Sequence, residues 1–299
     1  MSTEFCSLTV SHGLGAGGRK TTPQVGTGTG GRFDAAPAAF VAGGGDLVST
    51  NPWRSPLARH SGPPFLRRVT LKEGIASSGF PFLISALQSL DITLASAVTF
   101  LVGENGSGKS TLLEGLASAI GFGAQGGSRD HAPAHPDETD TTLGASLRLE
   151  WHRKTADGFF FRAETLYSFA SLLQSLGSDF GAYGGRNLRH QSHGESFLAI
   201  FQHRFRQGIF LLDEPEAALS PTRQLAFLRI LKDLVRTREA QFIIATHSPI
   251  LITFPGSTVL SMDAALAAVP YQSTDQYRIT RDFLSAPERY HRQLFTDDD

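Results

Sequence analysis

Residues 98–111 read Val-Thr-Phe-Leu-Val-Gly-Glu-Asn-Gly-Ser-Gly-Lys-Ser-Thr. A mostly apolar run typical of a buried strand leads into the pattern G-x-x-x-x-G-K-[ST], and helical spacing follows at 111–120. Glycines let backbone N–H groups turn inward around phosphate oxygens, where a side chain would collide. The positive end of the following helix points at the same anion. The stretch therefore predicts a phosphate-binding loop.

The residue types in this loop indicate a nucleoside triphosphate with a magnesium ion. Lys109 is expected to reach the β- and γ-phosphates, and the Ser110 hydroxyl is expected to hold Mg²⁺. The residues expected to bind the nucleotide are Gly103, Glu104, Asn105, Gly106, Ser107, Gly108, Lys109, Ser110 and Thr111.

A second motif reads Ile-Phe-Leu-Leu-Asp-Glu-Pro at 209–215. Four apolar residues predict a buried strand that carries two carboxylates at its carboxyl end, where ligands bind in parallel sheets. Asp213 is expected to bind Mg²⁺ through water. Glu214 is placed to accept a proton from the attacking water. An ordinary acidic loop after a strand is the alternative, which the presence of the phosphate-binding loop disfavours.

A third motif, Thr-His-Ser-Pro, stands at 246–249, where the apolar strand expected at 241–246 ends. A histidine there can donate a hydrogen bond to the γ-phosphate or hold the attacking water, whereas a lone histidine is usually structural. Its place after the strand that follows the Asp-Glu pair favours the catalytic interpretation. The candidate catalytic residues are therefore Glu214 and His247, and the candidate metal ligands are Ser110 and Asp213.

The fourth motif, Gln-Ser-His-Gly-Glu-Ser at 191–196, opens a helix expected at 194–206. Ser192 stands 21 residues before Asp213. A serine and a glycine at a helix start offer a hydroxyl and backbone N–H groups to an anion. Taken alone, this motif is better interpreted as a simple helix cap.

The four motifs, in this order, resemble the ABC-type P-loop ATPases, which include transporter motor domains and the SMC-type DNA-repair ATPases. The resemblance covers about residues 65–295. It implies ATP and Mg²⁺ as cofactors, and a signature motif in which Ser192, Gly194 and Glu195 contact the γ-phosphate held by the other subunit. More closely, the chain is similar to small stand-alone bacterial ATPases that share Ser-x-Gly-Glu-Ser and Leu-Asp-Glu-Pro-Glu-Ala-Ala-Leu-Ser.

The chain departs from the family pattern in several places. His193 replaces the first signature glycine, and Ser220 stands where many members have Asp. The strand expected at 159–164 ends in Glu164 rather than the Gln of the family's Q-loop. Phe80 and Phe82 precede the phosphate-binding loop; core packing is expected for both, with stacking on adenine as the alternative.

The expected fold is α/β. Apolar strands at 98–102, 209–212 and 241–246 alternate with helices at 111–120 and 221–238, which predicts a mainly parallel sheet flanked by helices. Further strands are expected at 65–71 and 90–94, and a hairpin is expected from 146–152 and 159–164, because Ala-Asp-Gly at 156–158 supplies turn residues. The resemblance adds an antiparallel β subdomain and a short helical lid at about 165–207.

Composition limits the possible domain organisation, metal sites and cellular location. Residues 1–62 hold 12 of the 31 glycines and show no hydrophobic period, which predicts a disordered tail before an ATPase domain at 63–299. Cys6 is the only cysteine, so a disulfide framework and a cysteine metal site are excluded. No apolar run reaches membrane-spanning length, and residues 1–20 lack the apolar core of a secretory signal. We therefore expect a cytoplasmic protein.

The spacing of the motifs limits the functional alternatives. Only 27 residues separate Glu164 from Ser192, too few for the long coiled coil of an SMC-type repair ATPase. We expect a soluble ATPase with Mg-dependent hydrolysis, whose ATP-bound homodimer acts as a switch on an unidentified protein partner. The alternatives are a motor subunit of an ABC transporter, an SMC-like DNA-repair-associated ATPase, and a scaffold that binds ATP with negligible hydrolysis.

Nucleic acid is a further open alternative as a partner. The net charge of −1 gives no global reason to expect it. Four arginines surround the signature with few acids between them, and contact with nucleotide phosphate or solvent is the favoured interpretation. They are Arg186, Arg189, Arg204 and Arg206.

Overall fold

The computed structural model describes residues 62–75, 79–123, 126–128, 138–155, 157–163, 198, 201–202 and 205–295. The expected tail at 1–62 and lid at 165–207 fall almost wholly outside these residues, so both, and the domain boundary between tail and ATPase domain, stay predictions. The same holds for three of the four arginines near the signature, Arg186, Arg189 and Arg204.

A six-stranded sheet forms the centre of the fold, and five of its strands run parallel. Only the last strand, at one edge, is antiparallel to its neighbour. In spatial order the strands are β5 (Gly158–Arg162), β6 (Gly208–Asp213), β7 (Ala240–Ala245), β3 (Val98–Val102), β8 (Thr258–Ser261) and β9 (Ala267–Ala268).

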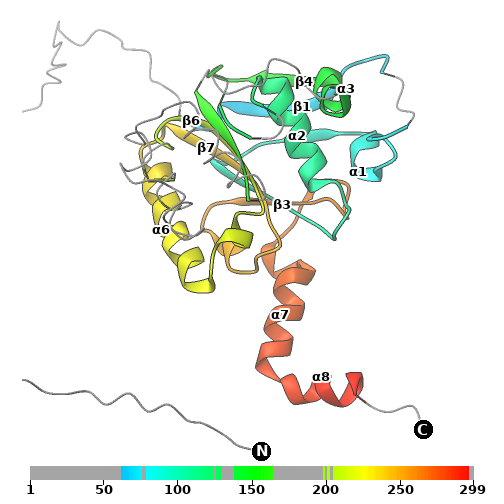
Figure 1. Cartoon of the computed structure of the whole chain (residues 1–299), viewed down its shortest axis with the longest axis vertical. Coiled ribbons are helices and arrows are strands. Elements are labelled where there is room, and N and C mark those ends of the chain that lie inside the picture. Colours follow the sequence, from blue (N-terminus) through cyan, green and yellow to red (C-terminus); the bar gives the residue numbers. More distant parts are fainter. Residues whose placement is uncertain are drawn as a thin grey trace, which may run out of the picture. The chain divides into compact units, whose positions relative to one another are not determined.

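Helices cover both faces of this sheet (Figure 1). Successive residues of β7 alternate between two hydrophobic cores, with Phe242 in one core and Ile243 in the other. Helix α6 (Pro221–Arg236) contributes Phe227 to the first core, and helix α2 (Lys109–Ile120) packs in the second. A strand buried on both faces reads as a continuous apolar run, which is why the sequence predicted three of these strands, β3, β6 and β7, correctly.

A smaller antiparallel sheet has the order β2-β1-β4. Its strands are β1 (Leu66–Leu71), β2 (Asp91–Thr93) and β4 (Leu147–Trp151). The buried side chain of Gln241, on β7, joins the two sheets: its Oε1 accepts the N–H groups of Phe65 and Leu66, and its Nε2 donates to the Leu66 carbonyl. The antiparallel β subdomain implied by the family resemblance is therefore present.

The expected hairpin between residues 146–152 and 159–164 is wrong, because its two strands belong to different sheets. Strand β4 pairs antiparallel with β1, whereas β5 lies parallel beside β6. Phe159 and Phe161 pack into one core and Phe160 into the other. A strand buried on both faces belongs in the covered parallel sheet, while β4, with its exposed Arg148, suits a sheet that has one face in water.

Several short helices were not predicted. They are α1 (Ser85–Gln88), α3 (Glu138–Ser146), α7 (Asp275–Ser285), α8 (Pro287–Leu294) and the 3-10 helices Pro215–Ala218, Leu251–Thr253 and Tyr271–Ser273. Helices α7 and α8 bury none of their side chains fully. Of the helix expected at 194–206, Leu198, Phe201 and Gln202 are helical, but Phe205 and Arg206 are not.

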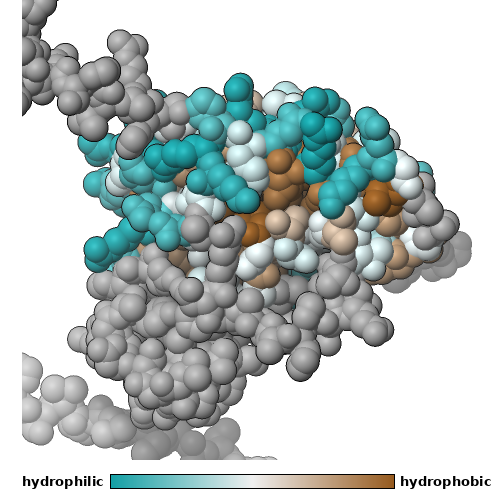
Figure 2. Space-filling model, turned by 90° about the horizontal axis from the view of Figure 1, so that it is seen from above, coloured by the Kyte–Doolittle hydropathy of each residue, from teal (hydrophilic) through white to brown (hydrophobic). Residues whose placement is uncertain are grey.

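The coloured part of the surface seen from above in Figure 2 is mostly hydrophilic, with a narrow strip of apolar residues between hydrophilic ones. On the antiparallel sheet, Arg68 and Asp91 face each other in an exposed ion pair of 2.6 Å. Within the part of the chain that the structure describes, no helix is both long enough and apolar enough to cross a membrane.

Candidate nucleotide-binding site

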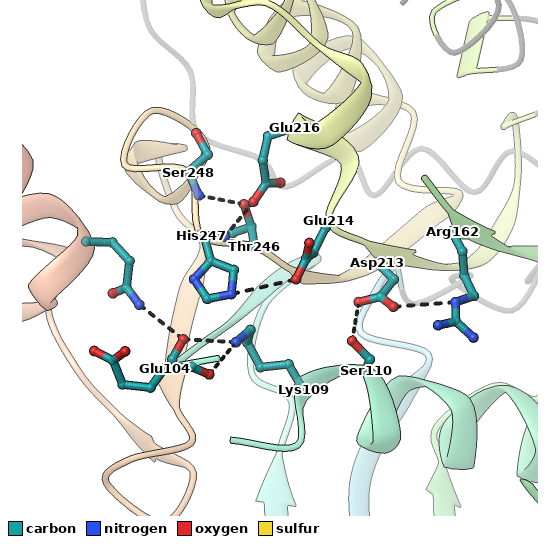
Figure 3. A network of polar contacts seen from close by, with 12 residues as sticks. Glu104, Lys109, Ser110, Arg162, Asp213, Glu214, Glu216, Thr246, His247 and Ser248 are labelled. Carbon is teal, nitrogen blue, oxygen red and sulfur yellow. Dashed lines mark hydrogen bonds and ion pairs between the residues drawn. The ribbon is translucent and has the colours of Figure 1, made fainter. Parts of the chain in front are cut away.

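The order of the sheet brings three motifs to one edge. Strands β6, β7 and β3 are adjacent and parallel, so their carboxyl ends lie side by side. The glycine-rich loop follows β3, the Asp-Glu pair ends β6, and Thr246-His247 follows β7. Figure 3 shows Lys109, Ser110, Asp213, Glu214 and His247 around one space. The sequence placed each residue at a strand end, and the strand order makes them neighbours.

The loop itself is a backbone cradle that side chains would fill. A Cβ on Gly103 would lie 2.8 Å from Ser107 Oγ and 2.9 Å from Met262 Cβ. Gly108 has a φ of 97°, and a Cβ there would lie 2.9 Å from Ile84 Cγ2. The Ser107 hydroxyl is buried and has no hydrogen-bond partner among the described residues. These features fit a loop that wraps around phosphate oxygens.

Lys109 is the buried cation of the site. Its side chain is only 4% exposed, and its Nζ donates to the carbonyls of Gly103 and Glu104, both at 2.9 Å. Burial lowers the pKa of the ammonium group, while nearby carboxylates, that of Glu214 first, act in the opposite direction. A desolvated cation that donates to neutral carbonyls is well suited to bind the phosphates of a nucleotide.

Ser110 and Asp213 form the candidate metal site. The Ser110 hydroxyl donates to Asp213 Oδ1 at 3.1 Å, and Asp213 is buried. Both offer the hard oxygen ligands that Mg²⁺ prefers. No cluster of three or more His, Cys, Asp or Glu side chains able to hold a metal occurs among the described residues. Two oxygen ligands of this kind would suit an ion that takes its other ligands from water and phosphate.

Glu214 and His247 lie opposite each other, with His247 Nε2 3.7 Å from Glu214 Oε1. Glu214 has a φ of 47° and a ψ of 54°, a left-handed conformation that costs a residue with a side chain about 1–3 kcal/mol. His247 Nε2 is buried and makes no hydrogen bond within the described part of the chain. A strained backbone at an acidic residue and an imidazole nitrogen without a hydrogen-bond partner in the described part of the chain are features typical of a functional site.

Glu216 belongs to the site, although its place in the motif Leu-Asp-Glu-Pro-Glu predicted no role for it. Its carboxylate accepts the backbone N–H of His247 at 2.5 Å and the hydroxyl of Thr246. Burial raises the pKa of Glu216, although these hydrogen bonds act against the shift. The contacts tie the turn after β6 to the loop after β7, so Glu216 holds His247 in place beside Glu214.

Other contacts to the site come from elements whose presence or whose pairing was not predicted. Gln276 of α7 donates to the Gly103 carbonyl at 3.3 Å, and Asp263, after β8, accepts the Glu104 N–H at 3.3 Å. Arg162 ends β5 directly beside Asp213 in the strand register. Its position depends on the pairing of β5 with β6, which the expected hairpin had hidden.

Some candidate residues cannot be placed. Ser192, Gly194 and Glu195, with the whole expected signature, lie outside the described residues, as does Glu164. Phe82 is buried in the core as expected. Phe80, however, is 61% exposed, so the expectation of core packing is wrong for this residue.

This fold and this loop define a P-loop ATPase. Comparisons with known proteins narrow the class. The family "AAA domain, putative AbiEii toxin, Type IV TA system" matches residues 179–253, and a second family, "AAA domain", matches residues 81–156. The cytochrome c biogenesis ATP-binding export protein CcmA of Rhodopseudomonas palustris is 30% identical over 166 residues, which are 51% of this chain and 79% of that protein. The chain belongs to the ABC-type P-loop ATPases.

Two solved structures are also similar. The SMC head domain from Thermotoga maritima shares 18% identity at a TM-score of 0.40, and the match covers 69% of this chain and 98% of that one. The protein cbiO1 from Clostridium perfringens, part of the ABC transporter complex cbiONQ, shares 16% identity at a TM-score of 0.40, with 77% and 99% covered.

Proposed function

We propose that the chain binds ATP with Mg²⁺ at residues 103–111 and hydrolyses it to ADP and phosphate. The observation that carries the proposal is the meeting of buried Lys109, the Ser110–Asp213 pair and the Glu214–His247 pair at the ends of three adjacent parallel strands. Cation, metal ligands and candidate base are the parts that phosphoryl transfer to water requires.

Each side chain has a distinct task in this proposal. Lys109 and the loop N–H groups hold the phosphates, while Ser110 and Asp213 hold the metal, whose charge stabilises the developing negative charge on phosphate oxygens. The Glu214 carboxylate accepts a proton as water attacks the γ-phosphorus and the bond to the bridging oxygen breaks. His247 Nε2 donates a hydrogen bond to a γ-phosphate oxygen, and Glu216 keeps this ring in position.

We further propose that the working unit is a homodimer closed by ATP. Family membership supports a site completed by the signature of a second copy, through Ser192, Gly194 and Glu195. Two such sites would lie in one symmetric interface. Because ATP contacts both copies, it stabilises the dimer, and loss of the γ-phosphate contacts releases it. Dimerisation would then be a switch that an unidentified protein partner reads.

A second candidate is the motor subunit of an ABC transporter. One observation favours it: the relative from Rhodopseudomonas palustris is named as an ATP-binding export protein. In that case the ATP-driven dimer would act on a separate membrane component. Capture of the Glu214→Gln protein with ATP, followed by identification of what copurifies, separates the two. A membrane permease supports the motor subunit, and a non-membrane partner supports the switch.

Nucleotide binding is tested by the affinity for a fluorescent ATP analogue. Lys109→Ala should abolish binding, because the phosphates lose the main point charge of the loop. Lys232→Ala is the matched control, since Lys232 is an exposed lysine of α6, and it should bind like the wild type. Unchanged affinity of the Lys109→Ala protein would refute the proposed site.

The dimer is tested by sedimentation velocity of the Glu214→Gln protein. It should be monomeric without nucleotide and dimeric with Mg-ATP. Adding Ser192→Arg should block the dimer through its bulk at the interface while ATP binding to the loop is retained. A trapped protein that stays monomeric at tens of micromolar, or a Ser192→Arg variant that dimerises equally well, would contradict the shared site.

A further inference from the structure

Arg162 lies between two carboxylates, one of which is the candidate metal ligand. It is the last residue of β5 and stands beside Asp213 in the parallel register of β5 and β6. Its Nε is 3.6 Å from Asp213 Oδ2, and its Nη1 is 2.5 Å from Glu114 Oε1. The other oxygen of Asp213 accepts the Ser110 hydroxyl (Figure 3). A permanent cation therefore adjoins the place proposed for Mg²⁺.

These charges are poorly screened by water. The side chain of Arg162 is 18% exposed, that of Glu114 is 23% exposed and that of Asp213 is 7% exposed. Charge interactions at such depth are several times stronger than in bulk water. A guanidinium also stays charged at every pH at which proteins are stable. Arg162 thus compensates the charge of Asp213 when no metal is bound.

A metal ion at Ser110 and Asp213 would be repelled by the same guanidinium. The two cations share the carboxylate of Asp213. Because Arg162 compensates part of its negative charge, Asp213 attracts Mg²⁺ less strongly. Glu114 acts in the opposite sense, because its carboxylate is in short contact with Nη1 and so competes with Asp213 for the guanidinium. The net affinity for Mg²⁺ depends on the balance of these two contacts.

We propose that Arg162 is a positioning residue that competes with Mg²⁺ for Asp213 and, balanced by Glu114, sets the metal affinity of the site. This inference rests on the proposed function, since it needs a nucleotide and a metal at the same site. In this proposal Arg162, at the end of β5, acts on the metal through its charge and does not bind it. Two substitutions must therefore act in opposite directions.

The experiment measures how much Mg²⁺ strengthens binding, independently of turnover. The affinity for a fluorescent ATP analogue is determined in EDTA and in saturating Mg²⁺, and the ratio gives the contribution of the metal. Arg162→Gln should raise this ratio about tenfold, a coupling of ordinary size between neighbouring ligands. Glu114→Gln should lower the ratio, because the freed guanidinium then turns to Asp213.

Two further variants serve as controls. Arg162→Lys keeps the positive charge and should keep a ratio near that of the wild type. Arg229→Gln removes an exposed arginine of α6 that pairs with Asp233, and it should leave the ratio unchanged. Circular dichroism and thermal unfolding establish that each variant is folded. If Arg162→Gln cannot fold, the lower ratio expected of Glu114→Gln, beside the unchanged ratio expected of Arg162→Lys, still decides.

The outcomes separate this inference from the proposed function. A wild-type protein that binds no analogue in either condition refutes the nucleotide site, and the inference falls with it. A wild type that binds, combined with equal ratios in Arg162→Gln and Glu114→Gln, overturns the inference alone. A lower ratio in Arg162→Gln also overturns it, because Arg162 would then support metal binding rather than oppose it.

Discussion

Two arginine–aspartate pairs in this molecule lie in contrasting surroundings. On the antiparallel sheet, Arg68 and Asp91 form two hydrogen bonds of 2.8 and 2.6 Å, with side chains 45% and 52% exposed. At the candidate site, Arg162 Nε lies 3.6 Å from Oδ2 of Asp213, whose side chain is buried. The Arg68–Asp91 pair is the one exposed to water, where ion pairs contribute least.

The difference indicates which charged groups serve function. Exposed charges are easily satisfied by solvent and by each other. At the ends of β3, β6 and β7, by contrast, burial shifts the pKa values of Lys109 and Glu216, and His247 Nε2 stays without a hydrogen-bond partner among the described residues. Buried charge that is incompletely satisfied is costly unless a ligand completes it. Removing charge at the two places should therefore have very different effects.

The largest effect is expected from Glu214→Gln. This variant should bind ATP with unchanged affinity yet hydrolyse it about 10²-fold or more slowly, as is typical for loss of a general base. Single-turnover kinetics with radiolabelled ATP separates binding from hydrolysis. Asp91→Asn, the same change from acid to amide on the antiparallel sheet, should hydrolyse ATP like the wild type. Normal turnover in Glu214→Gln would move the base role to another residue, with His247 first.

A second prediction extends the comparison to Gln241, a buried polar side chain whose amide makes three hydrogen bonds. Gln241→Leu leaves the N–H groups of Phe65 and Leu66 and the Leu66 carbonyl without their partner. Each unsatisfied buried group costs about 1–3 kcal/mol, so the free energy of unfolding should fall by roughly 3 kcal/mol or more. Urea denaturation measures it, with Gln88→Leu, an exposed position, as control. Equal stability of the two variants would remove Gln241 as the link between the sheets.

Much of the central sheet could be predicted because its strands carry continuous apolar runs. The strands expected at 98–102, 209–212 and 241–246 match β3, β6 and β7 to within one or two residues. The pattern cannot reveal spatial order, however. Strand β3 lies beside β7, which is far away in the sequence, and β5 joins β6 rather than β4. Turn residues near 157 favoured a hairpin, and burial of three consecutive phenylalanines on both faces outweighed them.

The same limit applies to the site. Motifs predicted the loop and the residues that end β6 and β7, because their chemistry is local to each segment. Arg162 and Asp263 reach the site through the order of the strands, and Gln276 reaches it from α7, a helix with no fully buried side chain. No spacing in the sequence signals such contacts. The roles assigned to Lys109 and His247 remain predictions that the variants above test.

A third prediction concerns pH, and it uses Glu216. Burial raises the pKa of this carboxyl in the folded protein, and the neighbouring charge of Glu214 adds to the effect, while hydrogen bonds from Thr246 and His247 oppose it. The folded state then binds more protons than the unfolded state between the ordinary and the raised pKa. Stability is therefore lost as pH rises through that window.

An amide at this position cannot titrate, yet its oxygen can still accept the His247 N–H. The melting temperature of Glu216→Gln, relative to wild type, should thus increase by a few degrees as pH rises from below the ordinary glutamate pKa to above the raised one. Thermal unfolding across this range measures the difference. Glu73→Gln, at an exposed position, should show a constant difference from wild type. A constant difference for Glu216→Gln as well would refute the buried-carboxyl account.

The smallest effect is expected from the surface pair. The hydrogen bond from Arg68 holds the pKa of Asp91 below its usual range, so the pair is formed, but both groups are fully open to solvent screening. Arg68→Gln, Asp91→Asn and the double variant should unfold within error of the wild type in urea, and the double-mutant cycle should give a coupling near zero at physiological salt. Affinity for the ATP analogue should also be unchanged in all three. A clear coupling would show that two aligned hydrogen bonds outweigh solvent screening on this sheet. A change in nucleotide affinity would instead connect the antiparallel sheet to the site, and the contrast between the two pairs would no longer separate structural from functional charge.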